Sequence, residues 1–366
     1  MKTVQQKKNR QDWLDAARAL GIVLVVLCHS VETYYRPVLL GQKRIGMLPW
    51  LAENFMFFAG RMGVPIFLCI SGVLLLEREH QVRQFYKRSL LPLVATTELW
   101  IVLNYLFVCS PIKNHVFRMD ELIREMLFLK EQSLSHMWYM PMIIGIYIAV
   151  PFLAKLLCNW EDIVDFKLIY LLGTGIFIIV PTVKVFLTEA LSSLPNLSVK
   201  LDGGFWGGCY GLYLVGGFFI VRKKVLAPIC SSILSMVAVV ALAFNTVGQY
   251  YLYSHKFFAT NGLYWYNDIA IFLNGLILFE FLRRFLDGKK IKGKTFLEYI
   301  SRCSFGIYLL HKPLLVLVEK YLPLEGMHTL IKVGILFTIG MFGSMLVTMP
   351  FYYRWKKTGR ILFHIK

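Results

Sequence analysis

The chain has 366 residues, of which 57% are hydrophobic and only 17% are charged. Soluble domains contain about 45–50% apolar residues, so this composition indicates a protein that is embedded in lipid. The formal net charge is +18, which in a soluble protein would favour nucleic-acid binding. Here the basic residues stand in short segments between apolar runs, as the positive-inside rule describes. The lipid bilayer, and not nucleic acid, is therefore the expected partner.

The apolar runs predict about ten transmembrane helices, because a helix needs about 20 mostly apolar residues to cross a bilayer. The first run ends in Cys28-His29-Ser30-Val31-Glu32 and not in a small-residue cleavage site, so we expect a retained helix. The predicted fold is all-α and polytopic, with one membrane-embedded domain over residues 1–366 and short cytoplasmic segments at 1–12 and 353–366. In chain order the runs are 14–34, 55–76, 90–109, 137–157, 168–187, 204–221, 226–245, 264–285, 299–321 and 330–352.

The distribution of Lys and Arg predicts the orientation of these helices. Five basic clusters fall on one side if ten helices alternate in direction, and Lys and Arg mark the cytoplasmic side. Both termini are therefore expected in the cytoplasm, and His364 in the tail is expected to be solvated. The clusters are the N-terminus and residues 78–88, 222–224, 283–294 and 354–360.

Cysteine usage predicts no metal centre and no disulfide framework. The number of cysteines is odd, seven, and none stands in a CxxC or other metal-binding spacing. We expect them to be small, buried apolar side chains.

The first predicted helix carries ionisable residues, which are functional candidates because a charge is costly within a membrane. Arg18 and His29 are eleven positions apart, so they share one face at a separation of about 16 Å. Arg18 at the inner edge suits phosphate recognition, and Asp15 can orient it. His29 suits a general base, and Glu32, three residues on, is expected to hold its ring in one tautomer. The alternative is that Arg18 anchors the helix at the interface and that His29 makes a structural contact.

The second predicted helix begins near Arg61 and contains Pro65 and the pair Ser71-Gly72. Proline frees a backbone carbonyl and can kink a membrane helix. The Ser-Gly pair allows close helix approach, so packing is the competing interpretation of Ser71.

Two later segments place histidine beside aromatic residues. His136, Trp138 and Tyr139 stand at the outer end of the fourth predicted helix, where an aromatic belt would explain Trp138 and Tyr139 but not His136. His311 lies deep in the ninth predicted helix, three residues after Tyr308. The pair suits the lining of a polar cavity, with a structural contact as the alternative.

Four segments together resemble the membrane acyltransferase-3 family, and the resemblance spans nearly the whole chain. The segment 13–30, with ten residues between Arg18 and His29, resembles the first helix of the family. The segment 64–72 resembles its second helix, 136–151 its fourth, and 304–311 its late Tyr–His helix. Each motif is weak alone, but their order within a ten-helix frame is specific.

The resemblance implies a multi-pass O-acyltransferase of the bacterial cytoplasmic membrane, commonly an acetyltransferase of polysaccharides. The implied donor is cytoplasmic acyl-CoA, with no bound cofactor, and the implied acceptor is a hydroxyl of a cell-surface or lipid-linked glycan. Arg18 and His29 correspond to the essential pair of the family. Many members have Arg-x-x-Arg after the second helix, whereas here Arg88-Ser-Leu-Leu91 lacks the second arginine. The soluble esterase-like domain of some members is also absent from the sequence.

The candidate set comprises catalytic residues His29, Arg18 and Glu32 and substrate-binding residues Asp15, Arg61, Ser71, Arg88, His136, Trp138, Tyr139, Tyr308 and His311. Two other functions are compatible with such a chain. One is a transporter or exporter of a glycan or lipid precursor, although the sequence has no convincing internal repeat. The other is a non-catalytic membrane partner in envelope assembly. The sequence does not indicate an oligomeric state.

Overall fold

The computed structural model describes residues 12–159, 163–190, 208–255 and 262–364, and these ranges contain helices and no strand. Helices form because lipid offers the backbone no hydrogen-bond partners, and a helix satisfies its N–H and C=O groups internally. In chain order they are α1 (Asp12–Leu39), α2 (Met47–Arg61), α3 (Gly63–Leu75), α4 (Val82–Phe85), α5 (Leu91–Cys109), α6 (Met119–Met126), α7 (Tyr139–Asn159), α8 (Ile163–Thr174), α9 (Val180–Ala190), α10 (Cys209–Arg222), α11 (Ser231–Ser254), α12 (Ile269–Leu286), α13 (Lys294–Tyr321), α14 (Thr329–Thr338), α15 (Ser344–Tyr353) and α16 (Lys356–Phe363).

Several of these helices join end to end into longer rods. Short π-helical turns connect α4 to α5, α8 to α9 and α14 to α15. The helix is interrupted at Met62, between α2 and α3, and Pro65 lies in the first turn of α3. Proline is tolerated there because the first N–H groups of a helix have no intrahelical acceptor. A 3₁₀ turn at Ser135–Trp138 leads into α7.

Seven spans in the described part of the chain are long and apolar enough to cross a membrane. The all-helical prediction is therefore confirmed, and the chain is a multi-pass membrane protein. The count of about ten crossings and the cytoplasmic location of both termini stay predictions, and residues 204–207 of the sixth predicted run lie outside the described ranges. The seven spans are 12–39, 47–75, 82–109, 135–159, 165–185, 231–254 and 329–353.

The outward faces of the bundle are apolar. On α8, Leu171 is 66% exposed, and on α11, Val247 is 69% exposed, with further large apolar side chains beside both. A soluble protein rarely presents apolar surface on this scale. These faces have the chemistry of a lipid-contacting surface.

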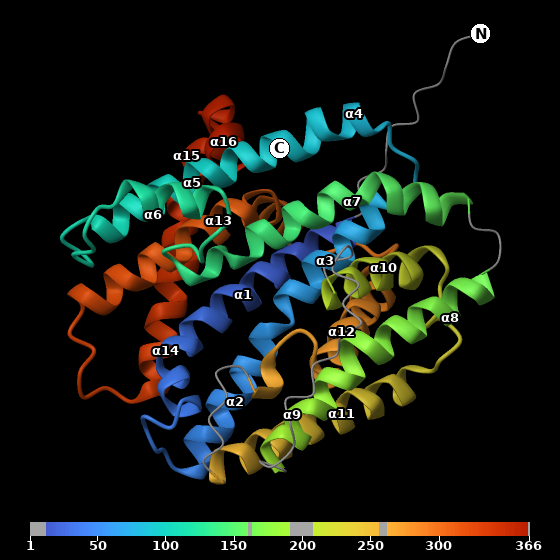
Figure 1. Cartoon of the computed structure of the whole chain (residues 1–366), viewed down its shortest axis with the longest axis horizontal. Helices are drawn as coiled ribbons and strands as arrows, with labels where there is room; N and C mark the ends of the chain where they lie inside the picture. The colour runs from blue at the N-terminus through green and yellow to red at the C-terminus, as the bar shows by residue number, and fades with distance from the viewer. Residues whose placement is uncertain (1–11, 160–162, 191–207, 256–261, 365–366) are drawn as a thin grey trace.

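Helix α1 lies at the centre of the bundle and contacts α2, α3, α12, α13 and α14 (Figure 1). Glycines allow the closest approaches. A Cβ at Gly60 would lie 2.7 Å from the Cys28 backbone on α1, and one at Gly72 would overlap the Leu214 carbonyl on α10. Small residues of this kind let membrane helices pack backbone to backbone. The prediction of close helix approach at Ser71-Gly72 is thus confirmed.

The predicted tail at 353–366 contains a packed helix. Helix α16 contacts α5, α13 and α15, and Phe363 near its end is buried. Its anchors include hydrogen bonds to its backbone from α5: the Trp100 indole donates to the Leu362 carbonyl at 2.6 Å, and the Thr96 hydroxyl to the Ile361 carbonyl at 3.0 Å. The end of the described chain is therefore fixed against the bundle.

Candidate active site

The site is built on α1 and α13, which pack together and run in the same direction. The Ser301 hydroxyl donates to the Asp15 carboxylate at 2.6 Å near the start of both helices. Further along both, Nε2 of His311 lies 2.9 Å from Nδ1 of His29. The two contacts fix the register of α1 against α13. They also mark two levels along these helices, that of Asp15 and Ser301 and that of His29 and His311, at which polar side chains lie inside the bundle.

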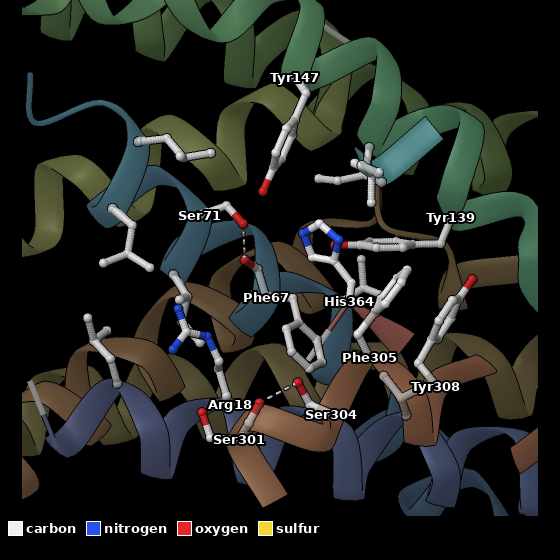
Figure 2. Close-up of a pocket in the computed structure, with 18 of the residues that line it drawn as sticks. Arg18, Phe67, Ser71, Tyr139, Tyr147, Ser301, Ser304, Phe305, Tyr308 and His364 are labelled. Atoms are coloured by element: carbon white, nitrogen blue, oxygen red, sulfur yellow. Dashed lines mark hydrogen bonds between the residues drawn. The ribbon is translucent and has the colours of Figure 1, made fainter. Parts of the chain in front are cut away.

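One cavity of about 790 Å³ connects these two levels. Ligand pockets commonly have volumes of about 300–1,000 Å³. We call its two extremes the basic end and the histidine end. The basic end is lined by Asp15, Arg18, Glu77, Arg222 and Arg302, and the histidine end by Cys28, His29, His136, Trp138, Tyr139, Tyr266 and Tyr308. His364 lines the cavity between the two ends, beside Phe305 (Figure 2).

At the basic end each arginine stands beside a carboxylate. An Arg18 Nη lies 3.4 Å from Asp15, Arg302 lies 2.7 Å from Glu298, and Arg222 pairs with Glu77. Among the described lining residues, three arginines thus face two carboxylates, Asp15 and Glu77. Guanidinium groups bind phosphate through paired N–H donors, so this end suits an anionic ligand.

Polar groups from opposite walls face the space between the two ends. Figure 2 shows the Arg18 side chain rising from α1 and the Tyr147 hydroxyl pointing down from α7 toward the same opening. The Ser71 hydroxyl, which donates to the Phe67 carbonyl at 2.9 Å, lies beside them. The cavity therefore offers polar contacts along its length and is not a purely apolar gap.

Three histidines cluster at the histidine end. The ring of His136 lies 5.2 Å from that of His311 and 6.3 Å from that of His29, measured between centroids. His136 is 1% exposed, and neither of its ring nitrogens forms a well-aligned hydrogen bond with a described residue, although the Leu309 backbone is nearby. The Tyr308 hydroxyl donates to the His136 carbonyl at 2.6 Å and holds the segment in place.

The contacts of His311 define the proton positions of the pair. Its Nδ1 faces two backbone carbonyl oxygens, of Tyr308 at 2.6 Å and of Ile307 at 3.2 Å, so this nitrogen carries a proton. In the neutral ring Nε2 then accepts, and Nδ1 of His29 must donate to it. The remaining nitrogen of His29, Nε2, keeps its lone pair. Because His29 lines the cavity, this is the tautomer that a general base requires.

We therefore expect His311 to act as a positioning residue for His29. Leucine at position 311 removes the acceptor of the His29 Nδ1 proton, and the turnover of a reaction that uses His29 as its base should fall by about 10²-fold. Glutamine places a carbonyl oxygen near the position of Nε2, so H311Q should recover part of that loss. The measurement is kcat and KM in purified membranes, with KM expected to stay constant. Equal rates in H311L and H311Q would contradict this role.

Nine of the twelve predicted site residues lie at the cavity or directly behind its wall. Eight of them line the cavity: Asp15, Arg18, His29, Ser71, His136, Trp138, Tyr139 and Tyr308. His311 lies directly behind this wall, through its contact with His29.

Three predicted positions require correction. Glu32 does not orient the His29 ring, because His311 occupies its Nδ1, and Glu32 instead lines a separate hollow. Arg61 lies among aromatic rings, 4.7 Å from the centroid of Phe57 and 5.5 Å from that of Trp265, and it does not itself line the cavity. Arg88 is exposed on the π-helical turn that precedes α5, and its neighbour Ser89 lines the cavity in its place.

The sequence interpretation missed several lining residues. His364 was expected to be solvated but lines the cavity, because α16 folds back onto the bundle. Arg302 and Ser301 also line it, one or two turns before Tyr308 on α13. The helical spacing from Ser301 to Tyr308 is a signal that could have identified that face.

Among the described residues, no group of three or more His, Cys, Asp or Glu side chains is arranged to hold a metal ion.

A family model described as an acyltransferase domain, that of the acyltransferase-3 family, matches residues 11–353. The chain belongs to the acyltransferase-3 family. No curated protein and no solved structure matches it. In this acyltransferase-3 member, the arginine and histidine of the first helix line one cavity.

Proposed function

We propose that this acyltransferase-3 member transfers an acyl group, in the simplest case acetyl, from cytoplasmic acyl-CoA to a hydroxyl of a cell-surface or lipid-linked glycan. One observation carries the proposal. A single cavity joins the guanidinium of Arg18 to the imidazole of His29, whose proton arrangement leaves one nitrogen free to act as a base. Membership of an acyltransferase family supplies the reaction class.

The basic end is the proposed donor site, on the cytoplasmic side. Arg18, Arg222 and Arg302 would bind the phosphates of CoA. The pantetheine arm would then extend along the cavity past Ser71 and Tyr147, which line it. This places the thioester at the histidine end.

The proposed chemistry at the histidine end is a direct acyl transfer. Nε2 of His29 takes the proton of the acceptor hydroxyl while the oxygen attacks the thioester carbonyl carbon. The C–O bond forms, the C–S bond breaks, and His29 returns the proton to the CoA sulfur. The buried ring of His136, whose nitrogens form no well-aligned hydrogen bond with described residues, would donate to the oxyanion in this mechanism.

Comparing cell-surface glycans of a deletion strain with those of its parent tests this function. We expect the deletion to remove one acyl mass from a glycan that is otherwise made and displayed normally, as read by mass spectrometry. Loss of the whole glycan from the surface would favour a transporter. An unchanged set of acyl masses would contradict the enzyme assignment.

A further inference from the structure

A second hollow, which we call the outer hollow, has a volume of about 280 Å³. It is separate from the large cavity and is polar. Its lining consists of Glu32, Thr33, Arg36, Pro37, Leu40, Gln42, Ser135 and Lys312.

The outer hollow borders the histidine end. Lys312 follows His311 in the chain, and Ser135 directly precedes His136. Glu32 lies three residues beyond His29 on α1, a rise of about 4.5 Å in the direction away from Arg18. The outer hollow therefore lies beside the three histidines, beyond them with respect to Arg18. A group held in the outer hollow lies next to the histidine end, where the donor thioester is proposed to lie.

The charges of the outer hollow are unbalanced. It contains two cations, Arg36 and Lys312, and one carboxylate, Glu32. Among the described residues, none of the three forms an ion pair within 4.0 Å with another side chain. The field of Glu32 reaches the buried Arg61, and that of Lys312 reaches the histidine cluster. With two cations and one carboxylate the lining carries a net positive charge, and the charge of Lys312 also reaches the Glu319 carboxylate further along α13. The remaining positive charge favours an anionic ligand.

We propose that the outer hollow is the acceptor subsite and that it selects a sugar unit with an anionic group, carboxylate or phosphate, near the hydroxyl that is acylated. This inference rests on the proposed function and adds the class of acceptor to it. Lys312 and Arg36 bind the anionic group, and Glu32 accepts a hydrogen bond from a neighbouring sugar hydroxyl. The acylated hydroxyl then points toward His29.

A competing expectation is a neutral sugar recognised by hydroxyl contacts alone. Glu32, Thr33, Gln42 and Ser135 would suffice for that task, and Arg36 and Lys312 would then have no ligand group to bind. A bound anion gives both cations a partner. Charge-assisted hydrogen bonds are roughly twice as strong as neutral ones, so the charge of the ligand should dominate its affinity.

The test measures binding of matched sugars to the purified full chain in lipid nanodiscs by calorimetry. The probe pairs are methyl glucuronide against methyl glucoside and glucose 6-phosphate against glucose. We expect at least one anionic probe to bind about tenfold more tightly than its neutral counterpart. Whether the glucuronide or the phosphate binds better identifies the group. No measurable binding of either anionic probe, or equal binding within both pairs, overturns the proposal.

Substitutions locate the effect. We define the charge preference as the affinity for the anionic probe divided by the affinity for its neutral counterpart. R36Q and K312Q should each reduce this ratio to near one, whereas E32Q should leave it unchanged or raise it. K43Q, on the exposed α1–α2 connection outside the hollow, is the matched control and should leave it unchanged. R36Q changes an exposed side chain, so it keeps the test decisive if K312Q does not fold. A charge preference that persists in R36Q overturns the assignment.

The binding readout separates this inference from the proposed function. Charge-selective binding that depends on Arg36, with no acyl mass lost in the deletion strain, would support an anion site in the outer hollow and refute the transferase. Loss of an acyl mass without charge-selective binding would support the transferase and refute the anion site in the outer hollow.

Discussion

Alanine at position 29 should abolish acyl transfer, with a loss of at least about 10³-fold in kcat. The ring of His29 lines the cavity, and its Nδ1 is engaged by His311, so its Nε2 is the group placed to take the hydroxyl proton. Donor binding should persist, since Arg18 lies about three turns away on α1. The measurement is transfer of labelled acetyl from acetyl-CoA to endogenous glycan in isolated membranes.

The control for this variant removes the same ring elsewhere. His255 is exposed at the end of α11, and H255A should retain full transfer at an equal protein level. Comparable thermal unfolding midpoints in detergent would show that H29A folds. Parent-like transfer by a folded H29A protein would remove His29 from the mechanism.

Arg18→Ala should raise the KM for acyl-CoA by about 10²-fold, the effect of removing one partner of a phosphate contact. The guanidinium lies at the basic end beside Asp15, and Arg302 lines the same cavity from α13. In the variant the Asp15 carboxylate remains at the wall without this cation and repels the donor. R18K should recover only part of the affinity, because an ammonium group cannot form the paired N–H contacts of a guanidinium.

A basic residue outside the cavity serves as the control for Arg18. Arg83 is exposed on α4 and does not line the cavity, so R83A should leave the KM for acyl-CoA unchanged at physiological salt. A KM that rises equally in R18A and R83A would mean that the arginines act through general surface charge. An unchanged KM in R18A would exclude a donor contact.

Sequence patterns were sufficient for the parts of the structure that depend on local chemistry. Long apolar runs predict helices because lipid forces the backbone to bond with itself. The eleven-residue spacing of Arg18 and His29 predicts a shared face, and both do line one cavity. Gly72 predicts a close helix contact, which α3 and α10 make.

Contacts between distant segments were not available from the sequence. Glu32 is near His29 along α1, but the partner of that ring is His311, 282 residues away in the chain. Arg61 is a conspicuous cation in an apolar segment, yet it lies against Phe57 of its own helix and against Trp265, 204 residues further along the chain. His364 lines the cavity only because the tail helix folds back. Each case depends on which helix faces which, a property that periodicity within one segment does not contain.

The most direct measurement of the central claim is a cryo-EM structure of the full chain in nanodiscs with a non-cleavable acetonyl thioether of CoA. The account predicts one bound analogue, with phosphates against Arg18 and the acetonyl carbonyl beside His29. Phosphates bound away from Arg18, or a carbonyl group in a space that does not connect to His29, would contradict it.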